Sequence, residues 1–205
     1  MVTATVVGVL LALAADQVPR LPHRRRVAFW VALTVALVPV FPKPLPIVEP
    51  LPLPAFIADG MWRPYVAGGR SLVPVPLPEV TTGREGMRWA GLSRLEFPVP
   101  RGYFMGPANP PENETGSWNA PRRYTSSLLQ WVSTTGTVPL ITDDQRRRAV
   151  ADLTFWRAGV VVLVPESRNV SSLSATLTQL LGREPQRAGG VVFWDMRDLP
   201  VPPPE

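Results

Sequence analysis

The side chains best suited to hold a ligand lie in one stretch rich in proline and glycine, residues 98–123. Arg101, Tyr103 and Arg122 bring two guanidinium groups and one phenol to this stretch, and such groups can grip a phosphate or the hydroxyls of a sugar. Long irregular loops in compact domains are often functional. These three residues are the candidate ligand site of the chain, while ordinary surface packing is the favoured interpretation of them.

Residues that catalyse covalent chemistry are scarce in this chain. It has no cysteine, which excludes disulfides, thiolate metal sites and cysteine nucleophiles, and its single histidine, His23, lies beside three arginines. A serine triad would need a histidine elsewhere in the chain. The glycine pairs at 68–69 and 189–190 lack the other residues of a phosphate-binding glycine loop. We predict no catalytic, cofactor-binding or metal-binding residue, and an autonomous enzyme is not expected.

The acidic pair Asp143 and Asp144 has a structural explanation. Thr142 and Gln145, three residues apart, have the pattern of a capping box. The two aspartates then lie in the first helical turn, where the helix dipole favours negative charge. A metal site would need further carboxylates nearby in the sequence, and the chain offers none there. We predict a capped helix at this point.

Two apolar segments, residues 2–15 and 27–41, decide where the rest of the chain is expected to lie. Neither shows the polar face at a period of 3.6 residues that marks a helix on a soluble core. Each is shorter than the roughly 20 residues that cross a hydrocarbon core, yet both are free of charge, which favours membrane insertion. The first also lacks the basic region of a signal peptide. We predict two membrane helices within residues 1–42.

An arginine-rich turn, residues 20–26, separates the two apolar segments. Short cytoplasmic loops carry an excess of arginine and lysine, so this turn is predicted to be cytoplasmic. The second helix then runs outward, and residues 43–205 form an extracytoplasmic domain at the cell membrane. The lipid bilayer is the partner that these segments predict.

The basic character of the chain, with a net charge of +5 and a pI near 10.6, invites a nucleic-acid interpretation. The arginines are scattered, however. Residues 24–26 flank an apolar segment, and residues 146–148 belong to a predicted helix, so that no basic stripe with interleaved aromatic residues joins them. We predict no nucleic-acid partner.

The residues after the apolar segments are predicted to form a small mixed α/β domain. Residues 70–77 form an extended segment in which Pro74 and Pro76 lack amide donors, so this strand belongs at an edge of a sheet or pairs on one side only. Apolar spacing predicts a helix over residues 87–95, a second from residue 125 or 126 to Gly136, and a third from the capping box to about residue 157.

The C-terminal third predicts a βαβ unit. Residues 159–165 are a continuous β-branched run, typical of a strand covered on both faces. A helix capped by Ser171 or Ser172 and ended by Gly182 follows, and residues 191–196 form another strand. The intervening length suits a right-handed crossover, so we predict that these two strands are parallel neighbours.

Several fold-bearing stretches carry a resemblance to a known family. They are "PLPAFIADGMWRPYV", "RSLVPVPLP", "GMRWA", "FPVPRGYFMGP", "TSSLLQWVSTTGTVPLITDDQRR", "DLTFWRAGVVVLVP" and "VVFWDM". With the outward helix before them, they resemble the C-terminal end of actinobacterial multi-pass membrane glycosyltransferases of the GT-C type, which use polyprenyl-phosphate sugars. The resemblance covers almost the whole chain.

This resemblance implies a role without catalysis. The family's catalytic acids lie on an early extracytoplasmic loop near its first membrane helices, and this chain has no such loop, so no catalytic residue is carried over. The resemblance implies that this chain corresponds to the last membrane helices and the C-terminal domain of such a protein. The domain would then lie near the acceptor site, and its ligand would be a lipid-linked sugar or a glycan acceptor. The first alternative is a complete membrane-anchored envelope protein whose α/β domain binds a glycan or a protein partner. A soluble hydrolase with a cleaved leader ranks last.

Overall fold

A computed structural model of the protein describes residues 2–20, 22–38, 51–80, 82–103, 105–109, 113–118 and 122–202. The chain divides into two compact units, Met1–Pro50 and Leu51–Glu205. The predicted domain boundary, after residue 42, lies outside the described residues.

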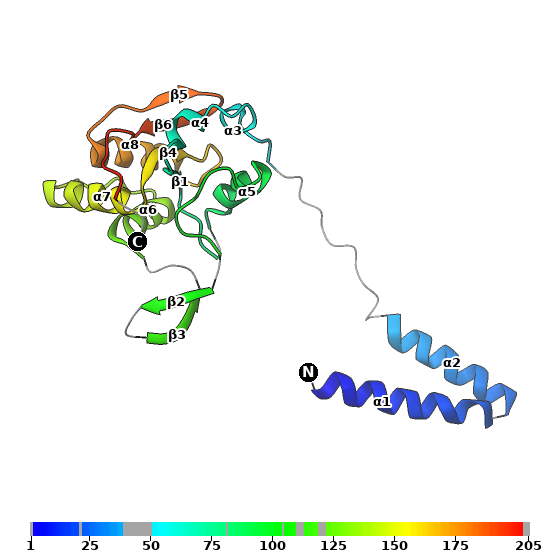
Figure 1. Cartoon of the computed structure of the whole chain (residues 1–205). Helices are drawn as coiled ribbons and strands as arrows, with labels where there is room; N and C mark the ends of the chain where they lie inside the picture. The colour runs from blue at the N-terminus through cyan, green and yellow to red at the C-terminus, as the bar shows by residue number, and fades with distance from the viewer. Residues whose placement is uncertain are drawn as a thin grey trace. The chain divides into compact units, whose positions relative to one another are not determined.

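The N-terminal unit consists of α1 (Val2–Gln17), the short 3-10 helix η1 (Val18–Arg20) and α2 (His23–Leu37) (Figure 1). The first apolar segment is therefore helical, and so is the second as far as Leu37. The three consecutive arginines of the predicted turn lie in the first turns of α2, because this helix begins directly after Pro22. Among the described residues, no helix has both the length and the apolar character needed to cross a membrane. This finding does not support the two predicted membrane helices, since the 16 residues of α1 extend only about 24 Å at about 1.5 Å per residue.

The second unit is built on a four-stranded sheet with the order β1-β4-β6-β5, and its mixed α/β fold is confirmed. The strands are β1 (Ser71–Val75), β4 (Ala158–Leu163), β5 (Gln186–Ala188) and β6 (Val191–Asp195). β1 is parallel to β4, whereas β6 is antiparallel to both β4 and β5. The proline-containing strand β1 lies at an edge of the sheet, as predicted.

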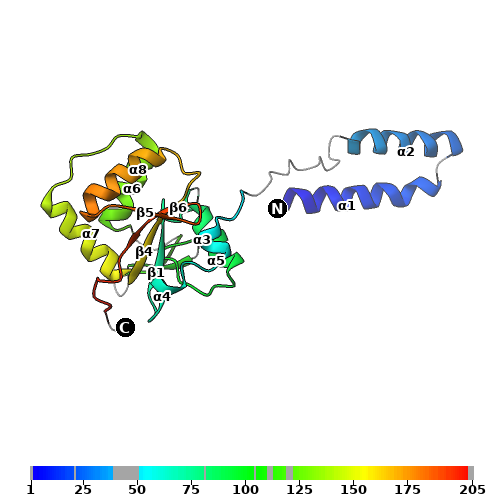
Figure 2. The same ribbon diagram turned by 90° about the horizontal axis from the view of Figure 1, so that it is seen from above.

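Helices cover both faces of this sheet, which gives three layers (Figure 2). One face carries α6 (Tyr124–Thr135), α7 (Asp143–Phe155) and α8 (Val170–Leu181), and the other carries α3 (Ala55–Ala58), α4 (Arg63–Val66) and α5 (Arg84–Leu92). Alternate strand residues point to opposite faces. Val161 and Leu163 of β4 belong to the first core, whereas Val160 and Val162 belong to the second. All six residues of β4 are buried, as its β-branched run predicts.

The predicted parallel pairing of the last two strands is wrong, because β4 and β6 are antiparallel. The short strand β5 follows α8, and Gly189 and Gly190, both with positive φ, turn the chain directly back into β6. The crossover through α8 therefore leads from β4 to β5, and β6 is inserted between them as in a split βαβ unit. The three residues of β5, Gln-Arg-Ala, carry no apolar alternation that would predict a strand.

A second hairpin lies in the stretch predicted to be irregular. β2 (Met105–Asn109) and β3 (Asn113–Trp118) pair antiparallel as a separate two-stranded sheet. Their sequences, "MGPAN" and "NETGSW", contain the glycine, proline and asparagine typical of turns, which is why composition predicts a loop here.

Helix ends follow the predicted signals where the chain carries a specific cap. Thr142 Oγ1 accepts a hydrogen bond from the Gln145 amide, and Gln145 Oε1 accepts one from the Thr142 amide, which confirms the capping box of α7. Gly136 and Gly182 end α6 and α8 in the left-handed conformation. The predicted serine cap of α8 is wrong, because Asn169 takes the N-cap position.

Gly159, in β4, tests how closely the layers are packed. A Cβ at this position would overlap the carbonyl group of Tyr65, in α4, and would lie 2.9 Å from Arg70 Cβ. Because backbone atoms cannot move aside without disturbing the sheet, we expect Gly159→Ala to lower the free energy of unfolding by about 2 kcal/mol or more. Urea unfolding followed by tryptophan fluorescence measures this loss.

The matched control is Gly91→Ala in α5, where a Cβ would meet nothing within 4 Å. This substitution should leave stability unchanged or raise it by up to about 1 kcal/mol, because alanine favours a helix over glycine. Equal stability of the two variants would contradict the close approach of α4 to β4.

Candidate functional site

Two of the three predicted ligand residues, Arg101 and Arg122, meet at one carboxylate, that of Glu79. Arg122 Nη2 lies 2.8 Å from Glu79 Oε2, and Arg101 Nη2 lies 3.3 Å from Glu79 Oε1. Only 9% of the Glu79 side chain is exposed. The structure thus brings these two arginines together around an internal acid.

The third predicted residue, Tyr103, lines a neighbouring cleft of about 420 Å³ that shares Glu79 as part of its wall. The Tyr103 side chain is about half exposed. Its backbone amide lies 3.3 Å from Met87 Sδ in α5, which holds this part of the loop against the helix. Glu79 is therefore the common neighbour of all three predicted residues.

Arg101 is the most deeply buried member of this group, with 3% of its side chain exposed. Its Nη1 donates to Ser126 Oγ at 3.2 Å, whereas its Nε is buried and has no hydrogen-bond partner among the described residues. Burial lowers the pKa of the Arg101 guanidinium, the Glu79 carboxylate opposes this effect, and the nearby Arg122 reinforces it.

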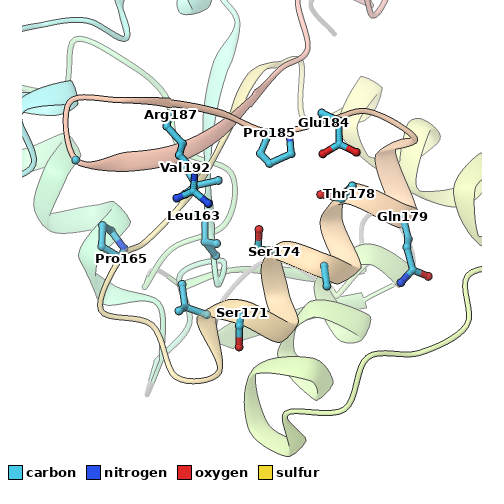
Figure 3. Close-up of a pocket in the computed structure, with 13 residues that line it drawn as sticks. Leu163, Pro165, Ser171, Ser174, Thr178, Gln179, Glu184, Pro185, Arg187 and Val192 are labelled. Atoms are coloured by element: carbon cyan, nitrogen blue, oxygen red, sulfur yellow. The ribbon is translucent and has the colours of Figure 1, made fainter.

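A cleft of about 840 Å³, here called the α8 cleft, lies between α8 and the β5–β6 edge of the sheet (Figure 3). Helix α8 buries Leu173, Leu177 and Leu180 in the core. Ser174 and Thr178 lie on the adjoining face of the helix, and because these side chains are small they leave space beside the short edge strand β5. Leu163 and Val192, from β4 and β6, add apolar surface to the cleft.

Polar groups from two sides face the α8 cleft. Figure 3 shows the hydroxyl groups of Ser174 and Thr178 directed into the space between α8 and Pro185, with Glu184 and Arg187 on the segment opposite. None of these four polar side chains has a hydrogen bond or ion pair within the described part of the chain. Their donors and acceptors are available to a ligand.

From the sequence, the α8 cleft is not predicted: Ser171 or Ser172 is interpreted as a helix cap, and no role is assigned to Ser174 or Thr178. The signal in retrospect is the pattern "SSLSATLTQ", residues 171–179, in which small polar residues alternate with the buried leucines. Such a helix has a polar face directly beside its apolar one, and that face becomes a wall wherever the neighbouring strand is too short to cover it.

The described lining of the α8 cleft has one carboxylate, that of Glu184, and no pair of them. Across the ranges that the structure describes, no group of three histidine, cysteine, aspartate or glutamate side chains is placed to hold a metal ion. The acidic pair Asp143 and Asp144 forms ion pairs with arginines of its own helix instead.

Comparison of the chain with protein-family models, with curated proteins and with solved structures finds no match. Function is therefore inferred from the residues and geometry of the chain itself.

The ion pairs of Glu79 with Arg101 and Arg122 predict that a conservative substitution of Glu79 lowers stability strongly. Glu79→Gln keeps the shape of the side chain but leaves the buried Arg101 without its counter-charge, so we expect a loss of about 3–5 kcal/mol in the free energy of unfolding. Glu96→Gln is the matched control, because the pair of Glu96 with Arg63 is exposed and should contribute at most about 1 kcal/mol. Losses of equal size in urea unfolding would contradict the internal role of Glu79.

Proposed function

We propose that residues 51–205 form a glycan-binding domain, without catalytic activity of its own, in a membrane glycosyltransferase-like protein. The observation that carries this proposal is the α8 cleft, in which Ser174, Thr178, Glu184 and Arg187 have no partner within the described chain. A lipid-linked sugar or a glycan acceptor is the ligand that we infer for it.

The lining of the α8 cleft supports a polyhydroxylated ligand. Hydroxyl, carboxylate and guanidinium groups together supply both donors and acceptors, which matches sugar hydroxyls that act as both. Leu163, Pro185 and Val192 offer aliphatic surface to the C–H faces of a sugar ring. The cleft volume, about 840 Å³, falls within the range of pockets that bind small molecules.

The absence of a carboxylate pair in the α8 cleft supports binding without hydrolysis. Most glycoside hydrolases use two carboxylates on either side of the scissile bond, one as acid and one as base or nucleophile. Glu184 is the one carboxylate among the described residues that line the cleft. A bound glycan would therefore be held in place without being cleaved there.

The composition of α1 and α2 supports the membrane part of the proposal. Large apolar side chains are exposed along both helices, among them Leu10, Leu13, Trp30, Val31 and Val35. A helix that is apolar on all sides needs an apolar environment. We infer that residues 1–42 associate with the cell membrane, with the arginine-rich residues 20–26 on the cytoplasmic side and residues 43–205 outside.

A second candidate is a membrane-anchored envelope protein whose α/β domain binds a glycan or a protein partner by itself. The observation that favours it is the pair of buried clusters on the two faces of the sheet, which gives residues 51–205 a core of their own. In the first candidate the domain is part of a glycosyltransferase-like protein, whereas in the second it serves an anchored protein that only binds.

Arg187 provides the test of the α8 cleft. We expect the full chain to bind at least one class of neutral oligosaccharide on a glycan array, and Arg187→Gln to weaken this binding about tenfold or more by removing charge-assisted hydrogen bonds. Arg147→Gln is the matched control, since Arg147 lies on the exposed face of α7. Absence of glycan binding, or an equal loss in both variants, would contradict the proposal.

The inferred topology has its own test, because the chain has no cysteine and a single introduced thiol is therefore unique. Thr137→Cys, in the exposed loop after α6, should react with a membrane-impermeant maleimide in intact cells. His23→Cys, at the exposed start of α2, should react only after the cells are permeabilised. The reverse labelling pattern would show that the inferred orientation is wrong.

A further inference from the structure

Three arginines line a second pocket, which has a volume of about 520 Å³ and shares no lining residue with the α8 cleft. We call it the arginine pocket. Arg101 comes from the loop after α5, Arg123 from the N-cap of α6, and Arg157 from the turn that joins α7 to β4. Phe155 and the segment 98–100 complete its walls.

Arg157 has a fixed backbone but an unpaired charge. Its carbonyl oxygen accepts a hydrogen bond from the Ser71 amide at 2.9 Å, and Ser71 Oγ donates to the Trp156 carbonyl at 2.6 Å, so β1 holds this turn in place. The Arg157 guanidinium lies against Gly69. Its Nε is buried without a hydrogen-bond partner, and no carboxylate in the described ranges forms an ion pair with it.

The other two arginines are only partly neutralised. Arg101 shares Glu79 with Arg122, and its buried Nε has no partner. Arg123 Nε lies 2.6 Å from Asp152 Oδ1, and its guanidinium lies 4.1 Å from the ring centroid of Phe155.

Positive charge therefore exceeds negative charge around the arginine pocket. Four guanidinium groups, those of Arg101, Arg122, Arg123 and Arg157, meet the two carboxylates of Glu79 and Asp152. Arg101 is buried and the other three cations are at least partly exposed. Holding this excess of positive charge with too little counter-charge costs free energy, and a bound anion would offset that cost. Arg157, which lines the pocket and forms no ion pair in the described ranges, is the cation that such an anion would neutralise.

We propose that the arginine pocket binds the phosphate group of a phosphate ester. Guanidinium groups from three different elements suit a tetrahedral oxyanion, whose oxygens point in several directions, better than a planar carboxylate. Phe155 is 57% exposed beside Arg123 and, with the proline-containing segment 98–100, offers an apolar wall to the organic part of the ester. This site does not depend on glycan binding in the α8 cleft.

Arg157→Gln is the decisive variant, because it removes a cation that has no partner inside the described chain. Calorimetric titration of the full chain with glucose 1-phosphate should show binding that glucose alone does not, and Arg157→Gln should weaken it about tenfold or more. Arg157→Lys keeps the charge but loses the planar guanidinium, so its affinity for glucose 1-phosphate should lie between those of the wild type and Arg157→Gln. The melting temperature of Arg157→Gln should equal or exceed that of the wild type, which separates lost binding from lost folding.

Arg187→Gln is the matched control, since Arg187 also lacks a partner but lies in the α8 cleft. Arg187→Gln should leave phosphate binding unchanged, and Arg157→Gln should leave glycan binding unchanged. Failure of phosphate binding in the arginine pocket can therefore be told apart from failure of glycan binding in the α8 cleft. Residues 1–42 are inferred to bind any vesicle. Only the part of flotation that requires phosphatidic acid in phosphatidylcholine vesicles and is lost in Arg157→Gln therefore shows that the phosphate is carried by a lipid rather than by a soluble sugar. The proposal is overturned if neither probe binds in a manner sensitive to Arg157→Gln, or if only Arg187→Gln reduces phosphate binding.

Discussion

Burial of β4 on both faces is the constraint on which the rest of the α/β unit depends. A strand whose six residues are all buried needs a helical layer above and below the sheet and a paired strand on each side. β1 and β6 supply the two pairings, and alternate β4 side chains supply both cores. The helices α6–α8 and α3–α5 are thereby assigned to opposite faces of the sheet (Figure 2).

Both candidate binding sites are found where this central strand begins and ends. The arginine pocket uses residues 155–157, directly before β4, and the α8 cleft uses Leu163 and Pro165 at its end. Strand ends are where the chain leaves the packed layers, so side chains there can face a ligand while the strand fixes their backbone. The α8 cleft carries hydroxyl groups with one carboxylate and one guanidinium group, whereas the arginine pocket carries an excess of guanidinium groups. The two sites therefore suit chemically different ligand groups.

The sequence was most informative where one local signal decides the structure. The β-branched run of β4 and the Thr142–Gln145 capping box each correspond to an observed element. β5 was missed because its three residues have no apolar pattern, and that omission reversed the predicted pairing of β6. For the sites, Arg101 is a candidate from its loop, whereas residues 123 and 157 enter the sequence analysis only as the ends of that loop and of a helix. Only tertiary contacts place the three arginines around one pocket.

The central claim, a domain that binds a glycan beside α8, is tested most directly by nuclear magnetic resonance of the ¹⁵N-labelled full chain titrated with a neutral oligosaccharide. The account predicts that amide shifts change along Val170–Leu181 and along the β5–β6 hairpin, while the amides of Val99, Arg101 and residues 155–157 stay in place. The claim would be contradicted if a saturating oligosaccharide left the amide shifts of α8 and of this hairpin unchanged. Shift changes centred on the arginine pocket would contradict it as well.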